Sequence, residues 1–204
     1  RVQSNASTII LTDAGDLAGA SAAASAVAMS AGGAINVAVP VSVTDLSLQT
    51  TSGDVTLQGL VTAGGSVAID TAGAVLDGNG DAVNVIADGL TVTSVSGIGS
   101  GNALETKIKN FHAANSTSGN IELINEGGLA VTGITSSGTG NVVLTNKGAA
   151  TVTGNVAGGG KIEFGIKGGL TINAAVTAES DVTLTANETD PASADDANAL
   201  TGNG

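Results

Sequence analysis

Four successive stretches of the sequence repeat one pattern, and this repeat constrains the fold more than any other feature. The stretches begin at Gly119, Gly140, Gly160 and Ser180, so their starts lie 21, 20 and 20 residues apart. A period of this length is typical of a solenoid, in which each repeat forms one coil that stacks on the coil before it.

Each coil opens with two apolar residues that flank a single outward position. The residues expected to form two buried core columns are Ile121, Val142, Ile162 and Val182, with Leu123, Leu144, Phe164 and Leu184. The intervening residue is mostly polar, and this alternation predicts a strand with one buried face. Two further short apolar segments follow in each coil, and clusters of Gly, Asn, Ser or Lys between them favour turns.

These apolar segments are too short and too closely spaced for helices to lie between them. A hairpin meander would explain the turns, but not why each type of segment returns about every 20 residues. The sequence therefore predicts an all-β chain folded as a parallel β-solenoid with coils of about 20 residues. The general rule for parallel crossovers predicts a right-handed β-helix.

The predicted domain organisation is a single solenoid segment of about nine coils over residues 1–204. An alanine-rich stretch, 20–30, suits a helix by propensity, but the restart of the frame at Gly33 favours a solenoid wall. At the other end, residues 188–204 are acidic and lack apolar segments, which predicts a loop-like end.

Residues 73–118 depart from the regular period and predict two longer, irregular coils. Leu104, Ile108 and Phe111 are spaced to share one face of a helix. Leu104, Thr106 and Ile108 equally fit the inward face of a strand. The sequence leaves both alternatives open.

Two residue types are expected to have structural roles at the corners of the coils. Pro40 would interrupt a central strand ladder, so it should lie at a corner. Asn125 and Asn146 occupy equivalent positions in consecutive coils, and we expect them to stack as a two-step ladder inside a turn.

Composition and charge exclude several classes of function. The chain has no Trp or Tyr and two Phe, whereas an enzyme of this size usually uses aromatic residues in its core and pocket. The net charge of −12, with six basic residues, argues against binding to nucleic acid or to an anionic membrane surface. No apolar stretch is long enough for membrane insertion. The absence of Cys excludes a disulfide, a thiolate metal site and a Cys nucleophile.

One group of residues resembles a calcium-binding loop. Asp77, Asn79 and Asp81 place oxygen ligands at alternate positions, and Asp88 occupies the twelfth. Calcium loops prefer Gly where Ala82 stands, and Glu rather than Asp at the twelfth position. The favoured interpretation is an ordinary Asp/Asn/Gly turn, and calcium is the one cofactor that the sequence suggests.

Two further patterns could carry catalysis. His112, the sole histidine, is interpreted as structural or exposed rather than as the base of a Ser-His-Asp arrangement. Glu122 and Glu163 share one outward column with Val143 between them, so about 9–10 Å should separate them. That spacing could suit an inverting glycosidase, but no aromatic residue is available to stack a sugar beside it. A solvated face is therefore the favoured interpretation.

Outward threonine rows raise the alternative of an ice-binding face, because such faces are flat arrays on solenoids. The partial rows are Ala130, Thr151 and Thr171, followed by Thr132, Thr153 and Asn173.

Several motifs resemble the filamentous-haemagglutinin-like exoproteins, which are very large bacterial surface adhesins. They are GNIELINEGGLAVTG from Gly119, GDVTLQG from Gly53 and DVTLTANETD from Asp181, and the resemblance spans about residues 33–190. It implies a secreted, rod-like β-helix at the bacterial cell surface that mediates adhesion or biofilm cohesion. No catalytic motif is carried over from the family.

We therefore expect a non-enzymatic structural and adhesive rod segment, extracellular and attached to a bacterial surface. The sequence begins with Arg1 and both ends stop within a coil without a polar cap, which predicts a segment of a longer or processed polypeptide. Its expected partners are flanking repeats or other copies end to end, and surface glycans or proteins. The alternatives are a filament or sheath subunit that stacks head to tail, and a carbohydrate-active or carbohydrate-binding β-helix.

Overall fold

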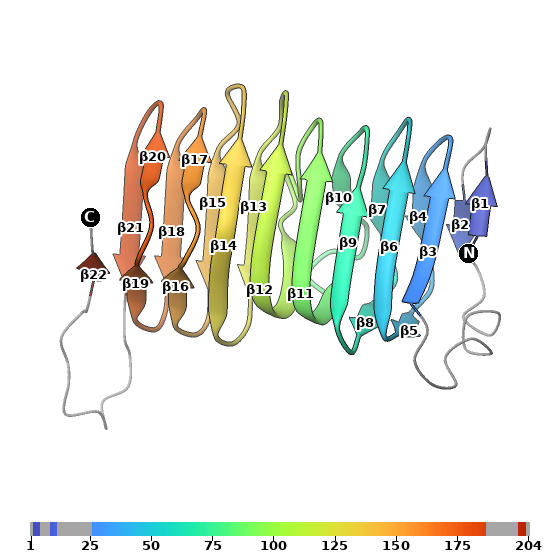
Figure 1. The fold of residues 1–204 in the computed structure, drawn as a ribbon, viewed down its shortest axis with the longest axis horizontal. Helices are drawn as coiled ribbons and strands as arrows, with labels where there is room; N and C mark the ends of the chain where they lie inside the picture. Colours follow the sequence, from blue (N-terminus) through green and yellow to red (C-terminus); the bar gives the residue numbers. More distant parts are fainter. Residues whose placement is uncertain (1, 5–8, 12–25, 187–199, 203–204) are drawn as a thin grey trace.

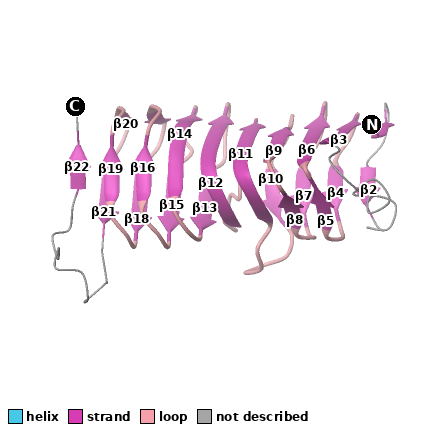
Figure 2. Ribbon diagram, turned by 60° about the horizontal axis from the view of Figure 1, so that its bottom comes forward, coloured by secondary structure: helices cyan, strands magenta, loops and turns pink. Residues whose placement is uncertain are grey.

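The computed structural model describes residues 2–4, 9–11, 26–186 and 200–202. Over these residues the chain is a parallel β-solenoid of about eight turns, with coils of about 20 residues and no helix. Figure 1 shows the coils side by side along one long axis, from the blue N-terminal end to the red C-terminal end. Figure 2 shows only strands and loops in the described part. The predicted fold class is confirmed.

Each coil crosses the molecule in one direction and then returns, so the strands form two layers (Figure 1). The first layer, where each coil opens, consists of β2 (Ile9–Leu11), β4 (Ile35–Val37), β7 (Val55–Leu57), β10 (Val75–Asp77), β13 (Ile121–Asn125), β15 (Val142–Asn146), β18 (Ile162–Ile166) and β21 (Val182–Ala186). Isolated bridges through Ile98 join β10 to β13.

The second layer carries the remaining long strands and the strand pairs that replace them in later coils. It consists of β1 (Val2–Ser4), β3 (Ala26–Ala31), β6 (Asp45–Thr50), β9 (Ser66–Asp70), the later parts of β11 (Val85–Ser94) and β12 (Leu104–Asn115), β14 (Leu129–Ser136), β16 (Ala150–Val152), β17 (Val156–Gly158), β19 (Leu170–Ile172), β20 (Val176–Ala178) and β22 (Leu200–Gly202). At the edge between the layers lie β5 (Val41–Val43), β8 (Val61–Ala63) and the beginnings of β11 and β12.

The two predicted core columns form with the predicted register. Ile121 pairs with Val142, Val142 with Ile162 and Ile162 with Val182, and the Leu123 column pairs in the same way. The columns are buried as far as Ile162 and Phe164, so like side chains stack through the interior.

The prediction that the last pair of core residues, Val182 and Leu184, is buried is wrong. Val182 is 43% exposed and Leu184 is only partly buried, although both keep the predicted register. These residues belong to β21, and no described first-layer strand lies beyond β21 to cover them. An inward position is therefore buried only where coils lie on both sides of it.

All the buried polar residues of the described part lie at the two edges where the layers meet. The upper column, at the top of Figure 1 where the second layer ends, contains Thr50, Thr71, Ser94, Asn115 and Ser136. The lower column, where the first layer ends, contains Asn84, Thr106, Asn125 and Asn146. Between them the core is apolar, so buried polar groups occur only where the backbone turns and needs partners.

The predicted asparagine ladder is confirmed. Asn125 and Asn146 are fully buried, and Asn125 Nδ2 donates to Asn146 Oδ1 at 2.9 Å. Asn146 Nδ2 in turn donates to the carbonyls of Gly148 and Ala149, at 2.8 and 3.0 Å. The ladder thus joins consecutive coils and satisfies backbone groups of the turn.

The irregular region is strand rather than helix. Leu104, Thr106 and Ile108 all point inward from β12, which confirms the strand alternative. Phe111 is also buried, because two consecutive exposed residues before it shift the inward phase. These coils are long because residues 78–83 and 99–103 add loops to the first layer.

Three other local predictions can be compared with the structure. Pro40 is exposed in the turn between β4 and β5, as expected. The alanine-rich stretch is strand over 26–30, and its residues 20–25 lie outside the described part. The loop-like end is wrong for residues 200–202, which form β22 and pair with β19; 188–199 and 203–204 also lie outside the described part.

One glycine at the start of the repeat frame is required by the stacking. Gly119 has φ of +78°, and an added Cβ would lie 2.2 Å from the carbonyl oxygen of Ser96 in the preceding coil. Both the left-handed backbone and the close approach exclude a side chain there.

Candidate functional site

The two added loops lie against each other on one side of the solenoid. Asn102, in the 99–103 loop, donates through Nδ2 to Asp77 Oδ2 at the start of the 78–83 loop. The first loop is organised by Asp77, whose Oδ1 accepts the backbone N–H of Asn79 at 2.9 Å and Nδ2 of Asn84 at 2.7 Å. Asp77 therefore uses both carboxylate oxygens to hold the loops together.

This geometry favours the ordinary Asp/Asn/Gly turn over the calcium loop. Asp88, the expected twelfth ligand, instead forms an ion pair with Lys109, whose Nζ lies 2.6 Å from Asp88 Oδ1. Among the residues that the structure describes, no group of three or more His, Cys, Asp or Glu is placed to hold a metal ion. Asp77, Asn79 and Asp81 share a loop, but the amides occupy the Asp77 oxygens that calcium would need.

Glu105 is the carboxyl group with the most unusual environment in this region. Its Oε2 is buried and has no hydrogen-bond partner. Burial raises the pKa of Glu105, and the nearby negative charges of Asp77 and Asp81 raise it further. Sequence reasoning missed this residue, because its neighbours come from the preceding coil and are far away along the chain.

The predicted glutamate column has the expected spacing but not the environment of a catalytic pair. Glu122 pairs with Val143 and Val143 with Glu163, so two rungs separate the carboxylates. Asn120 Nδ2 donates to Glu122 Oε1 at 2.6 Å, and Lys161 Nζ donates to Glu163 Oε2 at 2.6 Å. The hydrogen bond from Lys161 to Glu163, with their mutual attraction, raises the pKa of Lys161. Both carboxylates are therefore held by local partners, which fits a solvated face.

His112 is exposed on β12 and packs over a glycine of the next coil. The register between β12 and β14 shifts after Phe111, which brings His112 opposite Gly133. A Cβ added to Gly133 would lie 3.0 Å from His112 Nδ1. The ring covers a bulge, and this is a structural role.

The threonine rows are only partly in place for an ice-binding face. Ala130, Thr151 and Thr171 pair in one row. In the next row, Thr132 Oγ1 donates to the Phe111 carbonyl at 3.0 Å and Thr153 Oγ1 to the Val131 carbonyl at 3.2 Å. These two hydroxyl protons serve the coil beneath, so they do not form an outward array.

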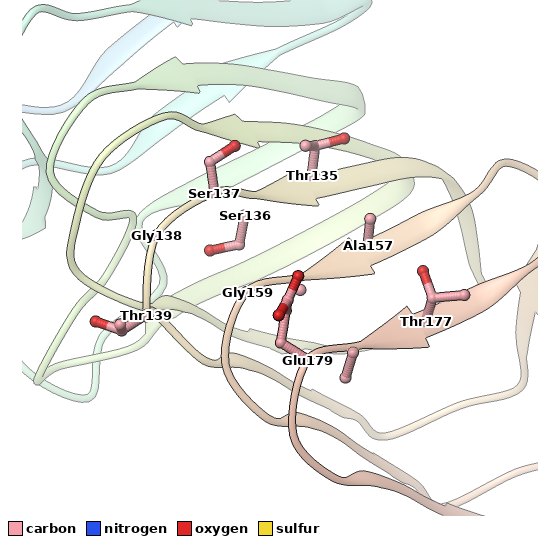
Figure 3. A pocket seen from close by; sticks show the side chains of 11 residues that line it. Thr135, Ser136, Ser137, Gly138, Thr139, Ala157, Gly159, Thr177 and Glu179 are labelled. Atoms are coloured by element: carbon pink, nitrogen blue, oxygen red, sulfur yellow. The ribbon is translucent and has the colours of Figure 1, made fainter.

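A hollow of about 590 Å³ at the upper edge was not anticipated from the sequence. We call this hollow the notch, and its floor is formed by Ala157, Gly158 and Gly159. The coil below contributes Thr135 and Ser137 to its wall, and the coil above contributes Thr177 and Glu179. Figure 3 shows the Glu179 carboxylate lying close to Gly159, between the two flanking coils.

Small residues in one coil between two bulkier coils create the notch. The equivalent positions in the rows read Thr135, Ala157 and Thr177, then Ser136, Gly158 and Ala178. The middle coil thus has no side chain beyond Cβ at this edge. The signal was available in an alignment of the repeats, where Ala-Gly-Gly-Gly at 157–160 stands between polar residues.

Lysines gather at the opposite, lower edge. Equivalent turns of four consecutive coils there carry Lys107, Glu126, Lys147 and Lys167, and Lys109 lies close by. The ion pairs between described residues join Lys107 to Glu126 at 3.2 Å, Lys109 to Asp88 and Lys161 to Glu163. Lys147 and Lys167 take part in none of them.

Comparisons with family models, with curated proteins and with solved structures found no match. The resemblance to surface exoproteins therefore rests on the sequence motifs alone. No helix of the described residues is long and apolar enough to span a bilayer.

Proposed function

We propose that this chain is a non-enzymatic structural rod, a segment of a secreted bacterial surface protein that serves adhesion or cohesion. The observation that carries the proposal is the continuous ladder of parallel strands over the described coils. Each coil donates backbone hydrogen bonds to its neighbours and stacks like residues in the core, so stiffness accumulates along the axis.

The corner columns support the same role. Asn115 Oδ1 accepts Ser94 Oγ at 3.1 Å, and its Nδ2 donates to the carbonyls of Ser118 and Gly119, both at 2.9 Å. Buried amide contacts of this kind fix the register between coils, because a one-residue slip would leave each amide without partners.

The sequence motifs support an extracellular place for this rod. Their resemblance to filamentous-haemagglutinin-like exoproteins favours attachment to a bacterial cell surface, with surface glycans or proteins as partners. The carboxylates that could have served catalysis instead accept local hydrogen bonds, as Glu122 and Glu163 do. A carbohydrate-active β-helix therefore has less support than a rod.

Display of the full chain on a non-adherent bacterium tests the proposal. We expect displaying cells to aggregate or adhere more than cells with the empty anchor, on an abiotic surface or on a panel of glycans. The control is the Leu144→Asp chain at equal surface density, which should lose the gain because Leu144 is buried in the core. Equal adhesion by displaying and empty-anchor cells would overturn the adhesive role.

A second candidate is a filament subunit that stacks end to end. The observation in its favour is the exposed Val182 and half-buried Leu184 on β21, in columns that are buried elsewhere. Negative-stain electron microscopy of the purified chain separates the candidates. Long uniform fibres would support the filament, and short separate rods would support the rod segment.

A further inference from the structure

The lower edge of the rod carries a stacked pair of lysines, Lys147 and Lys167, that form no salt bridge with a described residue. The backbone N–H of Lys147 donates to the Asn125 carbonyl and that of Lys167 to the Asn146 carbonyl, both at 2.9 Å, so the two lysines occupy equivalent turns of consecutive coils. Both are exposed, and neighbouring coils are about 4.8 Å apart. Like charges at this spacing repel each other. Glu126 lies in the turn before that of Lys147, but it is already paired with Lys107, and Glu105 attracts Lys147 without forming a salt bridge. Lys167 therefore remains available to a further carboxylate, and Lys147 is only partly compensated.

The upper edge of the same coils offers such a group. The backbone N–H of Glu179 donates to the Gly158 carbonyl at 2.9 Å, and this contact holds the Glu179 side chain beside the notch. Its carboxylate is exposed, makes no ion pair with a described residue, and lies close to Gly159 (Figure 3). The hydroxyls of Thr135, Ser137 and Thr177 surround the hollow and add oxygen acceptors for an ammonium group.

The lysine pair and the notch with Glu179 lie at the same level along the rod axis. Lys147 and the notch belong to the coil at 140–159, whereas Lys167 and Glu179 belong to the next coil, at 160–179. The edges lie on opposite sides of the molecule, as Figure 1 shows for the turns after β15 and β18 and for the tips of β17 and β20. A second rod displaced sideways, without rotation, would therefore bring its lysine pair level with the notch.

We propose that the notch binds the lysine pair of a second copy of this chain, so that parallel rods associate side by side. Lys147 of one copy extends over the Ala157–Gly159 floor, and Lys167 lies against Glu179. The contact joins different surfaces of the two copies, so it leaves one edge of each rod free and can continue as a row. The proposal extends the proposed cohesive role by naming a surface and a partner for it.

Charge sets the conditions under which this contact should form. Each copy has a net charge of −12, which opposes approach at low ionic strength. At about 0.15 M salt the screening length is about 8 Å, so distant repulsion fades while the close Lys–Glu contacts persist. Exposed ion pairs are weak, so the expected contact is transient and needs a method that records brief encounters.

Zero-length carbodiimide cross-linking meets this need, because it joins an amine to a carboxylate only when the two touch. We would mix equal amounts of unlabelled and ¹⁵N-labelled full-length chain at about 0.15 M salt and identify heavy–light peptide pairs by mass spectrometry. The expected product joins Glu179 of one copy to Lys147 or Lys167 of another. Lys161, whose Nζ lies 2.6 Å from Glu163 of its own chain, is the control lysine and should give mainly products within one chain.

Charge reversal makes the test decisive. Glu179→Lys alone, and Lys147→Glu with Lys167→Glu alone, should each lower the yield of intermolecular product at least tenfold. A mixture of the two variants should restore it, because each then offers the complement of the other. All three positions are exposed, so circular dichroism should show unchanged folding.

Intermolecular products that favour other carboxylates, or yields unchanged in both variants, would overturn the lateral contact. Either result would leave the proposed rod function standing, since the rod and its adhesion to other partners are measured separately.

Discussion

Asn125 Nδ2 donates to Asn146 Oδ1 at 2.9 Å inside the lower edge, and both side chains are fully buried. Asn125 Oδ1 accepts Thr106 Oγ1 at 3.0 Å and the backbone N–H of Ile108 at 2.9 Å. This series of side-chain hydrogen bonds therefore connects three consecutive coils along one edge of the core. It stabilises the register of the coils as well as the turns.

Removing one side chain from this hydrogen-bonded series should destabilise the fold. Asn146→Ala leaves the Asn125 amide and the carbonyls of Gly148 and Ala149 without their partner, and we expect a loss of about 1–3 kcal/mol in unfolding free energy. Denaturant unfolding measures it. Asn155→Ala is the control, because Asn155 is exposed, and it should change stability by less than about 0.5 kcal/mol. Equal effects of the two variants would contradict the ladder.

Substitutions in the core columns should cause a larger loss of unfolding free energy. Leu144 is 1% exposed between Leu123 and Phe164, whereas the adjacent Val143 points outward. Leu144→Asp should cost more than the roughly 2–5 kcal/mol of a buried Leu→Ala change, because it also buries an unpaired charge. Val143→Asp should be tolerated. Unfolding in denaturant that is unchanged by Leu144→Asp would show that this side of the strand does not face the core.

Glu105 should make stability depend on pH in the direction opposite to that of most carboxylates. Its pKa is raised in the folded state, so folding favours the protonated form. The stabilisation is fully present below the ordinary value of 4.5 and is lost as the pH rises through the folded pKa. Glu105→Gln should therefore raise the melting temperature at pH 7, and this gain should shrink towards pH 4. A constant difference across that range would contradict the assignment.

Asp45 provides a control of opposite sign. The backbone N–H and then the hydroxyl of Ser66 donate to its carboxylate, at 2.7 and 2.8 Å, and these bonds lower its pKa. Its contribution is present above the ordinary value of 3.8 and is lost as the pH falls through the lowered folded pKa. Asp45→Asn should therefore lower the melting temperature at pH 7 and bring the variant closer to the parent in acid.

Loss of Asp77, which holds the loop at 78–83, should lower the stability of the fold, whereas calcium should not change it. Asp77→Ala removes the acceptor of Asn79 N–H and Asn84 Nδ2, which should cost about 1.5–3 kcal/mol because the acceptor is charged. Millimolar calcium or a chelator should leave the melting temperature of the parent unchanged. A clear rise with calcium would contradict this, because a ligand that binds only the folded state must stabilise it.

The repeat period and the inward alternation were enough to predict the parallel solenoid, the register of the first-layer strands and the Asn125–Asn146 contact. These features depend on residues at a fixed separation of about 20 along the chain, which a sequence displays directly. The strand over Leu104–Ile108 stayed ambiguous, because a few apolar residues fit both periods and only the neighbouring coils decide between them.

The features that sequence reasoning missed arise from contacts between coils. Thr50 and Thr71 share a 2.8 Å hydrogen bond in the upper column, although they lie 21 residues apart along the chain. The environment of Glu105 depends on loops added to the coil before it, and the notch depends on side chains missing from one coil only. Exposure of Val182 likewise depends on which coils surround it, and alternation within a strand carries no information about that.

The measurement that tests the account most directly is thermal unfolding of a chain that lacks one whole coil, residues 160–179. If the coils are equivalent structural units, Val182 and Leu184 pair with Val142 and Leu144, and the chain keeps its strand signal and unfolds in one cooperative transition. A half-coil deletion, 160–169, is the matched control and should abolish that transition, because it places second-layer strands against the first layer. Loss of folding in both deletions, or in neither, would contradict a rod built by stacking equivalent coils.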